Sequence, residues 1–119
     1  MRAPTRNARK ATATIAAGAS LSGAVGTGGL ELAAIITPSG WDAADITFQA
    51  KYDGTEYYDA YISTADTEVT IQAAASRFIT IPAGVLNGAS SIKVRSGTTG
   101  SAVNQGDAVT LTLIFASAV

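Results

Sequence analysis

Apolar and polar side chains alternate strictly in two stretches of this chain, with a period of two residues. The stretch 46–52 reads Ile-Thr-Phe-Gln-Ala-Lys-Tyr, so that Phe48 and Tyr52 share one face. The second stretch, 109–115, reads Val-Thr-Leu-Thr-Leu-Ile-Phe, and here Ile114 interrupts the polar face. A period of two belongs to a β-strand with one buried face, whereas an amphipathic helix needs a period near 3.6. Both stretches therefore predict half-buried strands.

Weaker strand patterns recur along the rest of the chain, and turn signals separate them. Asp53-Gly54 follows the first alternating stretch directly, which is a strong hairpin signal. Many short strands divided by turns are typical of sandwiches and barrels, and only single helical turns are expected, at 41–45 and 72–76. We predict an all-β chain of about eight short antiparallel strands in a single β-sandwich of jelly-roll-like topology. The further strands are expected at 11–16, 30–37, 57–63, 68–72, 77–81 and 91–95.

Small side chains dominate the composition, because Ala, Gly, Ser and Thr supply 61 of the 119 residues. A core built mainly from such residues is thin, since hydrophobic stabilisation grows with the apolar area removed from water. Exposed apolar patches often mark interfaces, and Ile114 on an otherwise polar strand face indicates one. We therefore expect contacts between copies to supplement the core, in a homo-oligomer for which a trimer is favoured.

The chain contains no histidine and no cysteine. Zinc sites built from these residues, thiol nucleophiles, their haem or iron–sulfur ligation and imidazole-based triads are therefore excluded. The acidic residues lie in or near expected turns, where Asp is common for hydrogen-bonding reasons. A carboxylate pair and a calcium site stay open as minor alternatives, although the regular calcium-loop spacing is missing. We predict that the protein is not an enzyme and needs no cofactor.

Charge is divided unevenly between the first ten residues and the rest. The basic residues Arg2, Arg6, Arg9 and Lys10 lie in 1–10 without any acidic residue, whereas 11–119 holds four basic and nine acidic residues. We predict a flexible basic N-terminal arm at 1–10 and a β-sandwich domain at 11–119. The arm is either a solvated terminus or a segment that docks on the acidic surface of a partner protein. Nucleic acid is disfavoured as a partner because the rest of the chain is negative.

The N-terminal region invites two further interpretations, a membrane span and a cleaved leader. No run of about 18 apolar residues exists, which is the length that a transmembrane helix needs, so we expect no membrane contact. An Arg-rich start followed by Ala, Ser and Thr also suits a targeting peptide, but 11–15 alternates like a strand. A cleaved leader is therefore the weaker alternative.

Aromatic residues concentrate in 41–61, which holds the single Trp and all four Tyr residues. Alternation places Phe48 and Tyr52 in the core, and Tyr57 and Tyr61 are the better candidates for exposure. Tyrosine rings suit core packing, a protein interface and sugar stacking alike. We predict that Tyr57 and Tyr61 belong to a partner-binding surface, and glycan contact stays as an alternative.

Five segments together resemble a group of small proteins from tailed bacteriophages and prophages. They are Ala-Thr-Ala-Thr-Ile-Ala-Ala-Gly-Ala-Ser-Leu-Ser-Gly-Ala-Val (11–25), Trp-Asp-Ala-Ala-Asp-Ile-Thr-Phe-Gln (41–49), Tyr-Asp-Gly-Thr (52–55), Ile-Lys-Val-Arg-Ser-Gly-Thr (92–98) and Val-Asn-Gln-Gly-Asp (103–107). The resemblance extends over about residues 11–115. It implies a virion structural protein, in the first place a head decoration (cement) protein on the capsid surface that binds the major capsid protein.

A part of this pattern is also similar to discoidin-like, galactose-binding β-sandwich domains. The similar elements are Ile-Thr-Phe-Gln, Asp-Gly and Ile-Lys-Val-Arg. In those domains the sandwich presents its loops to glycans. The alternative function that this similarity implies is a glycan-binding module of a phage tail or fibre.

Overall fold

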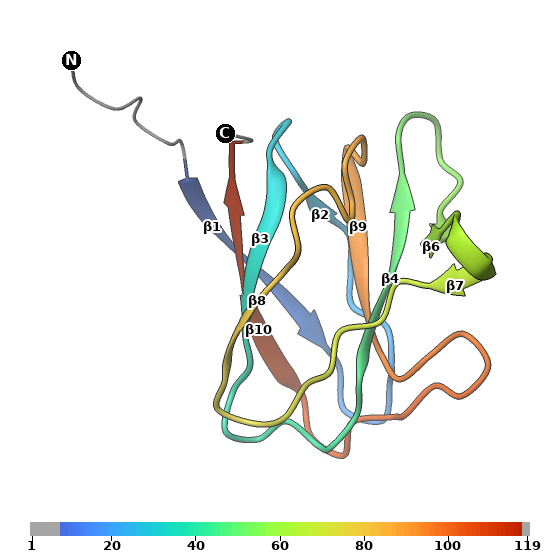
Figure 1. Cartoon of the computed structure of the whole chain (residues 1–119). Helices are drawn as coiled ribbons and strands as arrows, with labels where there is room; N and C mark the ends of the chain where they lie inside the picture. The colour runs from blue at the N-terminus through green and yellow to red at the C-terminus, as the bar shows by residue number, and fades with distance from the viewer. Residues whose placement is uncertain (1–7, 118–119) are drawn as a thin grey trace.

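In the computed structural model, residues 8–117 are described, and this part of the chain forms ten β-strands and one short 3-10 helix (Figure 1). Eight strands build two antiparallel four-stranded sheets, and β6 and β7 form a separate hairpin that carries the helix η1. The elements are β1 (Ala8–Ile15), β2 (Val25–Gly26), β3 (Glu31–Ile36), β4 (Ile46–Lys51), β5 (Tyr58–Asp59), β6 (Tyr61–Ile62), η1 (Thr64–Asp66), β7 (Thr67–Glu68), β8 (Phe78–Thr80), β9 (Ser91–Ser96) and β10 (Val109–Ala116).

The strand order of the two sheets follows a nested pattern. Sheet I has the order β1-β10-β3-β8, and sheet II has the order β2-β9-β4-β5. When the β6–β7 hairpin is set aside, the first strand pairs with the last, the second with the next to last, and so on inward to β4 and β5. One long antiparallel hairpin rolled into two sheets gives this order, which is that of a jelly roll. The predicted all-β sandwich of jelly-roll type is confirmed.

The core lies between the sheets and is built by the alternating positions of the long strands. In β10 the inward residues Leu111, Leu113 and Phe115 are completely buried. In β4, Phe48 is completely buried as well, as its alternation predicts. Trp41, in the connection between β3 and β4, belongs to the same core: it is 4% exposed and donates from Nε1 to the carbonyl oxygen of Ala44 at 3.2 Å.

Several local expectations differ from the structure. The first strand begins at Ala8 rather than at residue 11, so it includes three residues assigned above to the arm. The segment 57–63 is divided between β5 and β6, and the helical turn lies at Thr64–Asp66 instead of at 41–45 or 72–76. The strand β2 in the Gly-rich region was missed, because its two residues give no alternation to detect.

Candidate functional site

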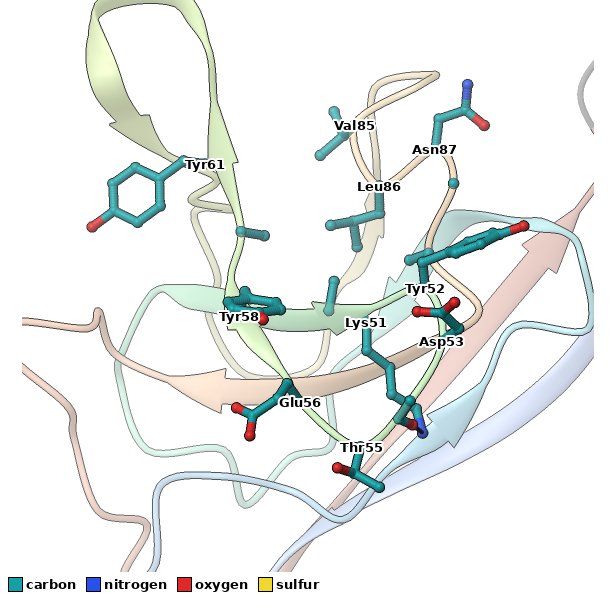
Figure 2. Close-up of a pocket in the computed structure, with 15 residues that line it drawn as sticks. Lys51, Tyr52, Asp53, Thr55, Glu56, Tyr58, Tyr61, Val85, Leu86 and Asn87 are labelled. Atoms are coloured by element: carbon teal, nitrogen blue, oxygen red, sulfur yellow. Dashed lines mark hydrogen bonds between the residues drawn. The ribbon is translucent and has the colours of Figure 1, made fainter.

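A groove of about 560 Å³ lies between the β4–β5 turn and the loop 82–90 (Figure 2). Tyr52, Tyr58 and Tyr61 line it, and these side chains are 76%, 68% and 50% exposed. Figure 2 shows Tyr58 and Tyr61 on one side and Tyr52 on the other, with Leu86 between them. We call this feature the tyrosine groove. Exposed aromatic rings around a hollow are typical of a binding surface, because they offer a large contact area for little conformational entropy.

The charged groups of the tyrosine groove are mainly acidic. Asp53 and Glu56 line it, and both are exposed. Lys51 also lines the groove, and its Nζ donates to the carbonyl oxygen of Gly54 at 3.1 Å and lies 5.2 Å from the centre of the Tyr57 ring. Carboxylates beside tyrosine faces favour cationic or hydroxyl-bearing ligands.

The structure separates the two tyrosines that the sequence singled out. Tyr61 lines the groove, whereas Tyr57 is half-buried on the outer side of sheet II. The Tyr57 hydroxyl is hydrogen-bonded to Ser91 Oγ at 2.7 Å, and Lys93 Nζ lies 4.5 Å from the centre of its ring. Tyr57 therefore ties the β4–β5 connection to β9.

Tyr52 and Tyr58 belong to the groove, but sequence reasoning did not assign them there. The placement of Tyr52 in the core was wrong. Strand β4 ends at Lys51, so the alternation that places Phe48 inward no longer holds one residue later. The Asp53-Gly54 turn signal was the available hint, since a residue at the rim of a hairpin turn lies beyond the covered part of the sheet.

The structure describes two of the four basic residues of the predicted arm. Arg9 and Lys10 lie in β1, which corrects the expected boundary at residue 10. The Arg9 guanidinium donates to the carbonyl oxygen of Gly26 and lies 5.1 Å from the centre of the Phe115 ring, so it fastens β1 to its surroundings. Arg2 and Arg6 fall outside the described residues.

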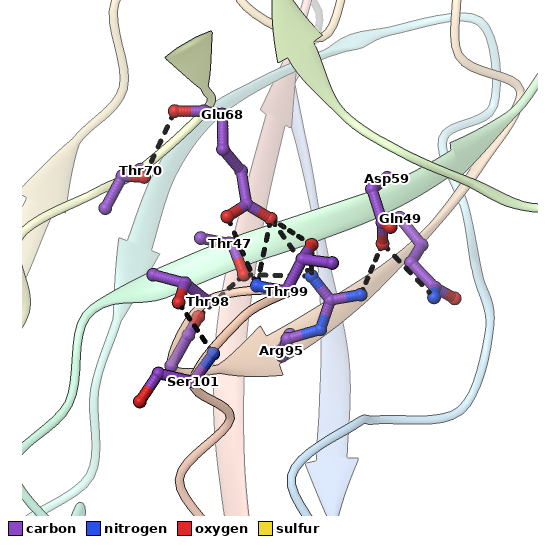
Figure 3. A network of polar contacts seen from close by, with 10 residues as sticks. Thr47, Gln49, Asp59, Glu68, Thr70, Arg95, Thr98, Thr99 and Ser101 are labelled. Carbon is purple, nitrogen blue, oxygen red and sulfur yellow. Dashed lines mark hydrogen bonds and ion pairs between the residues drawn. The ribbon is translucent and has the colours of Figure 1, made fainter.

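A second polar cluster centres on Arg95, which points to the outer side of sheet II and is only 7% exposed (Figure 3). Its Nη2 lies 2.5 Å from Asp59 Oδ1, and its Nη1 lies 3.1 Å from Glu68 Oε2. Nη1 also donates to Thr99 Oγ1 at 2.8 Å and to Thr47 Oγ1 at 3.3 Å. One guanidinium thus joins β4, β5, β7, β9 and the loop after β9.

The electrostatics of this cluster fit a structural role. The hydrogen bond from Arg95 and its positive charge hold the pKa of Asp59 below its ordinary value, against the opposing effect of burial. Glu68 also accepts a hydrogen bond from the backbone N–H of Thr99 at 3.2 Å. A buried charge needs such compensation, because an unpaired ion away from water is costly. The cluster is therefore closed by its own partners and fastens the β6–β7 hairpin and the loop 97–102 over the sheet.

The outer side of sheet I differs from the covered outer side of sheet II because it carries exposed apolar side chains, and we call it the open face. Ile36 and Phe78 are register partners there and are 36% and 64% exposed. Thr14 and Thr110 join their hydroxyl groups at 3.0 Å on the same side. A hollow of about 590 Å³ borders Phe78 at the edge of the sheet. The outward residues of these four strands include two charged side chains, Lys10 and Glu31, and Glu31 is the register partner of Ala116. The others are Ala8, Thr12, Thr14, Ala34, Ile36, Phe78, Thr80, Thr110, Thr112, Ile114 and Ala116.

Within residues 8–117, no three or more acidic side chains come together in a way that could hold a metal ion. The same part of the chain contains no helix long and apolar enough to cross a membrane. Comparisons with protein-family models, with curated proteins and with solved structures found no match to this chain.

Proposed function

We propose that the chain is a structural protein of a tailed-phage virion, a head decoration protein that coats the shell and binds the major capsid protein. The observation that carries this proposal is the open face, a sheet surface with an exposed Ile36–Phe78 pair and only two charged side chains on its strands, Lys10 and Glu31. Apolar patches on small soluble proteins often mark protein interfaces. Aromatic residues are enriched there, and charged ones are depleted from the interface centre.

Two further arguments support the assignment. The sequence resembles small virion proteins over about residues 11–115, and jelly rolls recur among viral capsid proteins. The latter is an argument from fold alone, and one fold serves many functions. A shell also repeats the same docking site many times, so that a contact of modest affinity gains from multivalency if copies are joined.

A mass-spectrometric inventory of separated heads and tails from the virions that contain this chain tests the location. We expect the protein in the head fraction and absent from the tails. Its recovery with tails or fibres, or its absence from purified virions, would overturn the proposal.

A titration onto heads stripped of the protein tests the surface. The double variant Ile36→Thr/Phe78→Thr is expected to bind at least tenfold more weakly than the natural chain, with an unchanged melting temperature. The matched control is Ile62→Thr, which removes an exposed apolar side chain on β6, away from the open face. Equal loss in the control would show that the effect is not specific to this surface.

The second candidate function is a glycan-binding module of a phage tail or fibre. It is favoured by the tyrosine groove, since exposed tyrosine rings and carboxylates at one hollow suit stacking and hydroxyl recognition. A glycan array with the natural chain and Tyr58→Ala tests it. Strong binding that Tyr58→Ala abolishes would favour this function over head decoration.

A further inference from the structure

We propose that the tyrosine groove binds the N-terminal segment 1–7 of a neighbouring copy of the chain. This segment, Met-Arg-Ala-Pro-Thr-Arg-Asn, carries Arg2 and Arg6 and no acidic residue. The groove presents the exposed carboxylates Asp53 and Glu56. The inference goes beyond the proposed function, because it concerns how copies join and holds wherever the protein is located.

The chemistry of the segment matches the groove in more than charge. A guanidinium can lie flat on a tyrosine ring and also form a two-pronged hydrogen bond with a carboxylate. Pro4 has no N–H group, and it biases the preceding residue toward extended backbone. Aromatic-lined grooves bind extended, proline-containing peptides in this way, because such segments have less conformational entropy to lose. The small residues between Arg2 and Arg6 leave room for contact with Leu86.

The start of β1 and the β4–β5 turn lie at the same end of the sandwich (Figure 1). β1 is an edge strand of sheet I and contacts β2, an edge strand of sheet II. β5, beside the groove, is the other edge strand of sheet II. The chain therefore leaves the described structure at the edge farthest from its own groove.

Chain length limits how much of the segment could reach the groove of its own copy. Three strand spacings of about 4.8 Å and a sheet separation of about 10 Å place β1 and β5 about 17 Å apart. Arg6 precedes Ala8 by two residues, which span about 7 Å even when fully extended. With its side chain added, Arg6 still falls short of its own groove, whereas Arg2, six residues before Ala8, is far enough along the chain to reach it. The groove of the same copy therefore cannot take both arginines, and the groove of a neighbouring copy can.

A contact between the terminal segment of one copy and the groove of the next is heterologous. Such contacts form a ring when the rotation closes, and an open chain when it does not. A closed ring of three copies agrees with the trimer expected from the sequence. The ring would also supply the multivalency that a protein binding a repetitive surface requires.

Charge reversal in the full-length chain tests the contact, with sedimentation velocity over a hundredfold range of concentration as the readout. The natural chain is expected to self-associate. Arg2→Glu/Arg6→Glu and Asp53→Lys/Glu56→Lys should each weaken the association at least tenfold, and the chain with all four substitutions should recover it. The matched control is Asp45→Lys/Asp107→Lys, which reverses two exposed acidic residues outside the groove and should associate like the natural chain.

The outcomes are separable from those of the proposed function, since no virion component is needed. A natural chain that stays monomeric, or variants that associate as well as it does, would overturn the inference. So would a chain with four substitutions that stays as weak as the double variants, because the effect would then not depend on complementary charge. Raised salt should weaken the association of the natural chain, since the pairs are exposed and screened.

Discussion

The outer faces of the two sheets differ in how far other segments of the chain cover them. On sheet II the β6–β7 hairpin and the loop 97–102 cover the outward side chains, so that Thr47 is completely buried and Arg95 is 7% exposed (Figure 3). On sheet I most outward side chains are uncharged, with Lys10 and Glu31 as the exceptions, and Phe78 is 64% exposed. The two inner faces, by contrast, are alike in being apolar and buried.

This difference distinguishes the outer face of sheet II, whose polar groups bond to other segments of the chain, from the outer face of sheet I, where apolar side chains stay exposed. A buried guanidinium requires that other segments cover it, because its charge must be matched by carboxylates from those segments. Asp59 in β5 and Glu68 in β7 supply these carboxylates, and the two residues flank β6 in the sequence. Threonine hydroxyls impose no such requirement, since water satisfies them at a surface. The polar network on sheet II therefore explains how the insertion between β5 and β8 is held, whereas Ile36 and Phe78 on the open face stay exposed.

The largest expected effect comes from Arg95→Leu. Removing the guanidinium leaves Asp59 and Glu68 without their shared partner, and breaking a buried ion cluster in this way costs about 3 kcal/mol. In a domain of this size that loss lowers the melting temperature by about 10 °C, measurable by calorimetry. Arg77→Leu, an equal change of charge at an exposed position, is the control and should change little. A melting temperature within about 2 °C of the natural chain would contradict the closed character of this face.

Gly97→Ala is expected to have the next largest effect, because it acts on the loop that covers Arg95. Gly97 has φ of 90°, and a Cβ there would lie 2.5 Å from the carbonyl oxygen of Ser101. Backbone strain and the clash together should cost about 2 kcal/mol in urea unfolding. Gly100→Ala lies in the same loop with nothing within 4 Å of its Cβ, so it serves as the control. Equal stability of the two variants would show that the loop does not need its present conformation.

The sequence predicted the inner faces well and the outer faces poorly, for a physical reason. Burial of every second residue leaves a pattern of period two, so Phe48 and Leu111 could be placed in the core without a structure. The cover over an outer face is made by segments distant in sequence, and no local pattern records them. Alternation within the expected strand 91–95 is enough to direct Arg95 outward, but its burial depends on Asp59 and Glu68, which are 36 and 27 residues away.

The candidate site shows the same division. The concentration of tyrosines in 41–61 coincides with the tyrosine groove, which Tyr61 lines. Tyr57 lies outside the groove, and no local pattern could indicate this, because its partners Ser91 and Lys93 lie on another strand. The groove itself needs the loop 82–90 beside the β4–β5 turn, and only the jelly-roll topology brings these two segments together.

Lowering the pH should weaken the Arg95 cluster on sheet II before it affects the open face. The pKa of Asp59 is lowered in the folded chain, mainly by its hydrogen bond with Arg95. As the pH falls, the unfolded chain therefore takes up this proton before the folded chain does. The contribution of Asp59 to the free energy of unfolding is fully present above its unfolded pKa near 3.8, and it is lost as the pH falls through the lower folded pKa. Urea unfolding from pH 7 to pH 3 should show a steeper loss for the natural chain than for Asp59→Asn. Parallel curves for these two proteins would contradict this assignment, with Asp107→Asn as the control.

The smallest effect on folding is expected from Phe78→Thr on the open face. Phe78 keeps 64% of its surface exposed in the folded chain, so that little apolar area is lost from the core and Thr retains strand propensity. The free energy of unfolding should change by less than about 0.5 kcal/mol, as for most surface substitutions. The same variant should nevertheless lose binding to phage heads, because an aromatic ring at an interface contributes far more to association than to folding when nothing else in the monomer covers it. A loss of about 2 kcal/mol in stability would instead mean that Phe78 is held by its own chain, and the contrast between the two faces would fail at the residue on which the proposed function most depends.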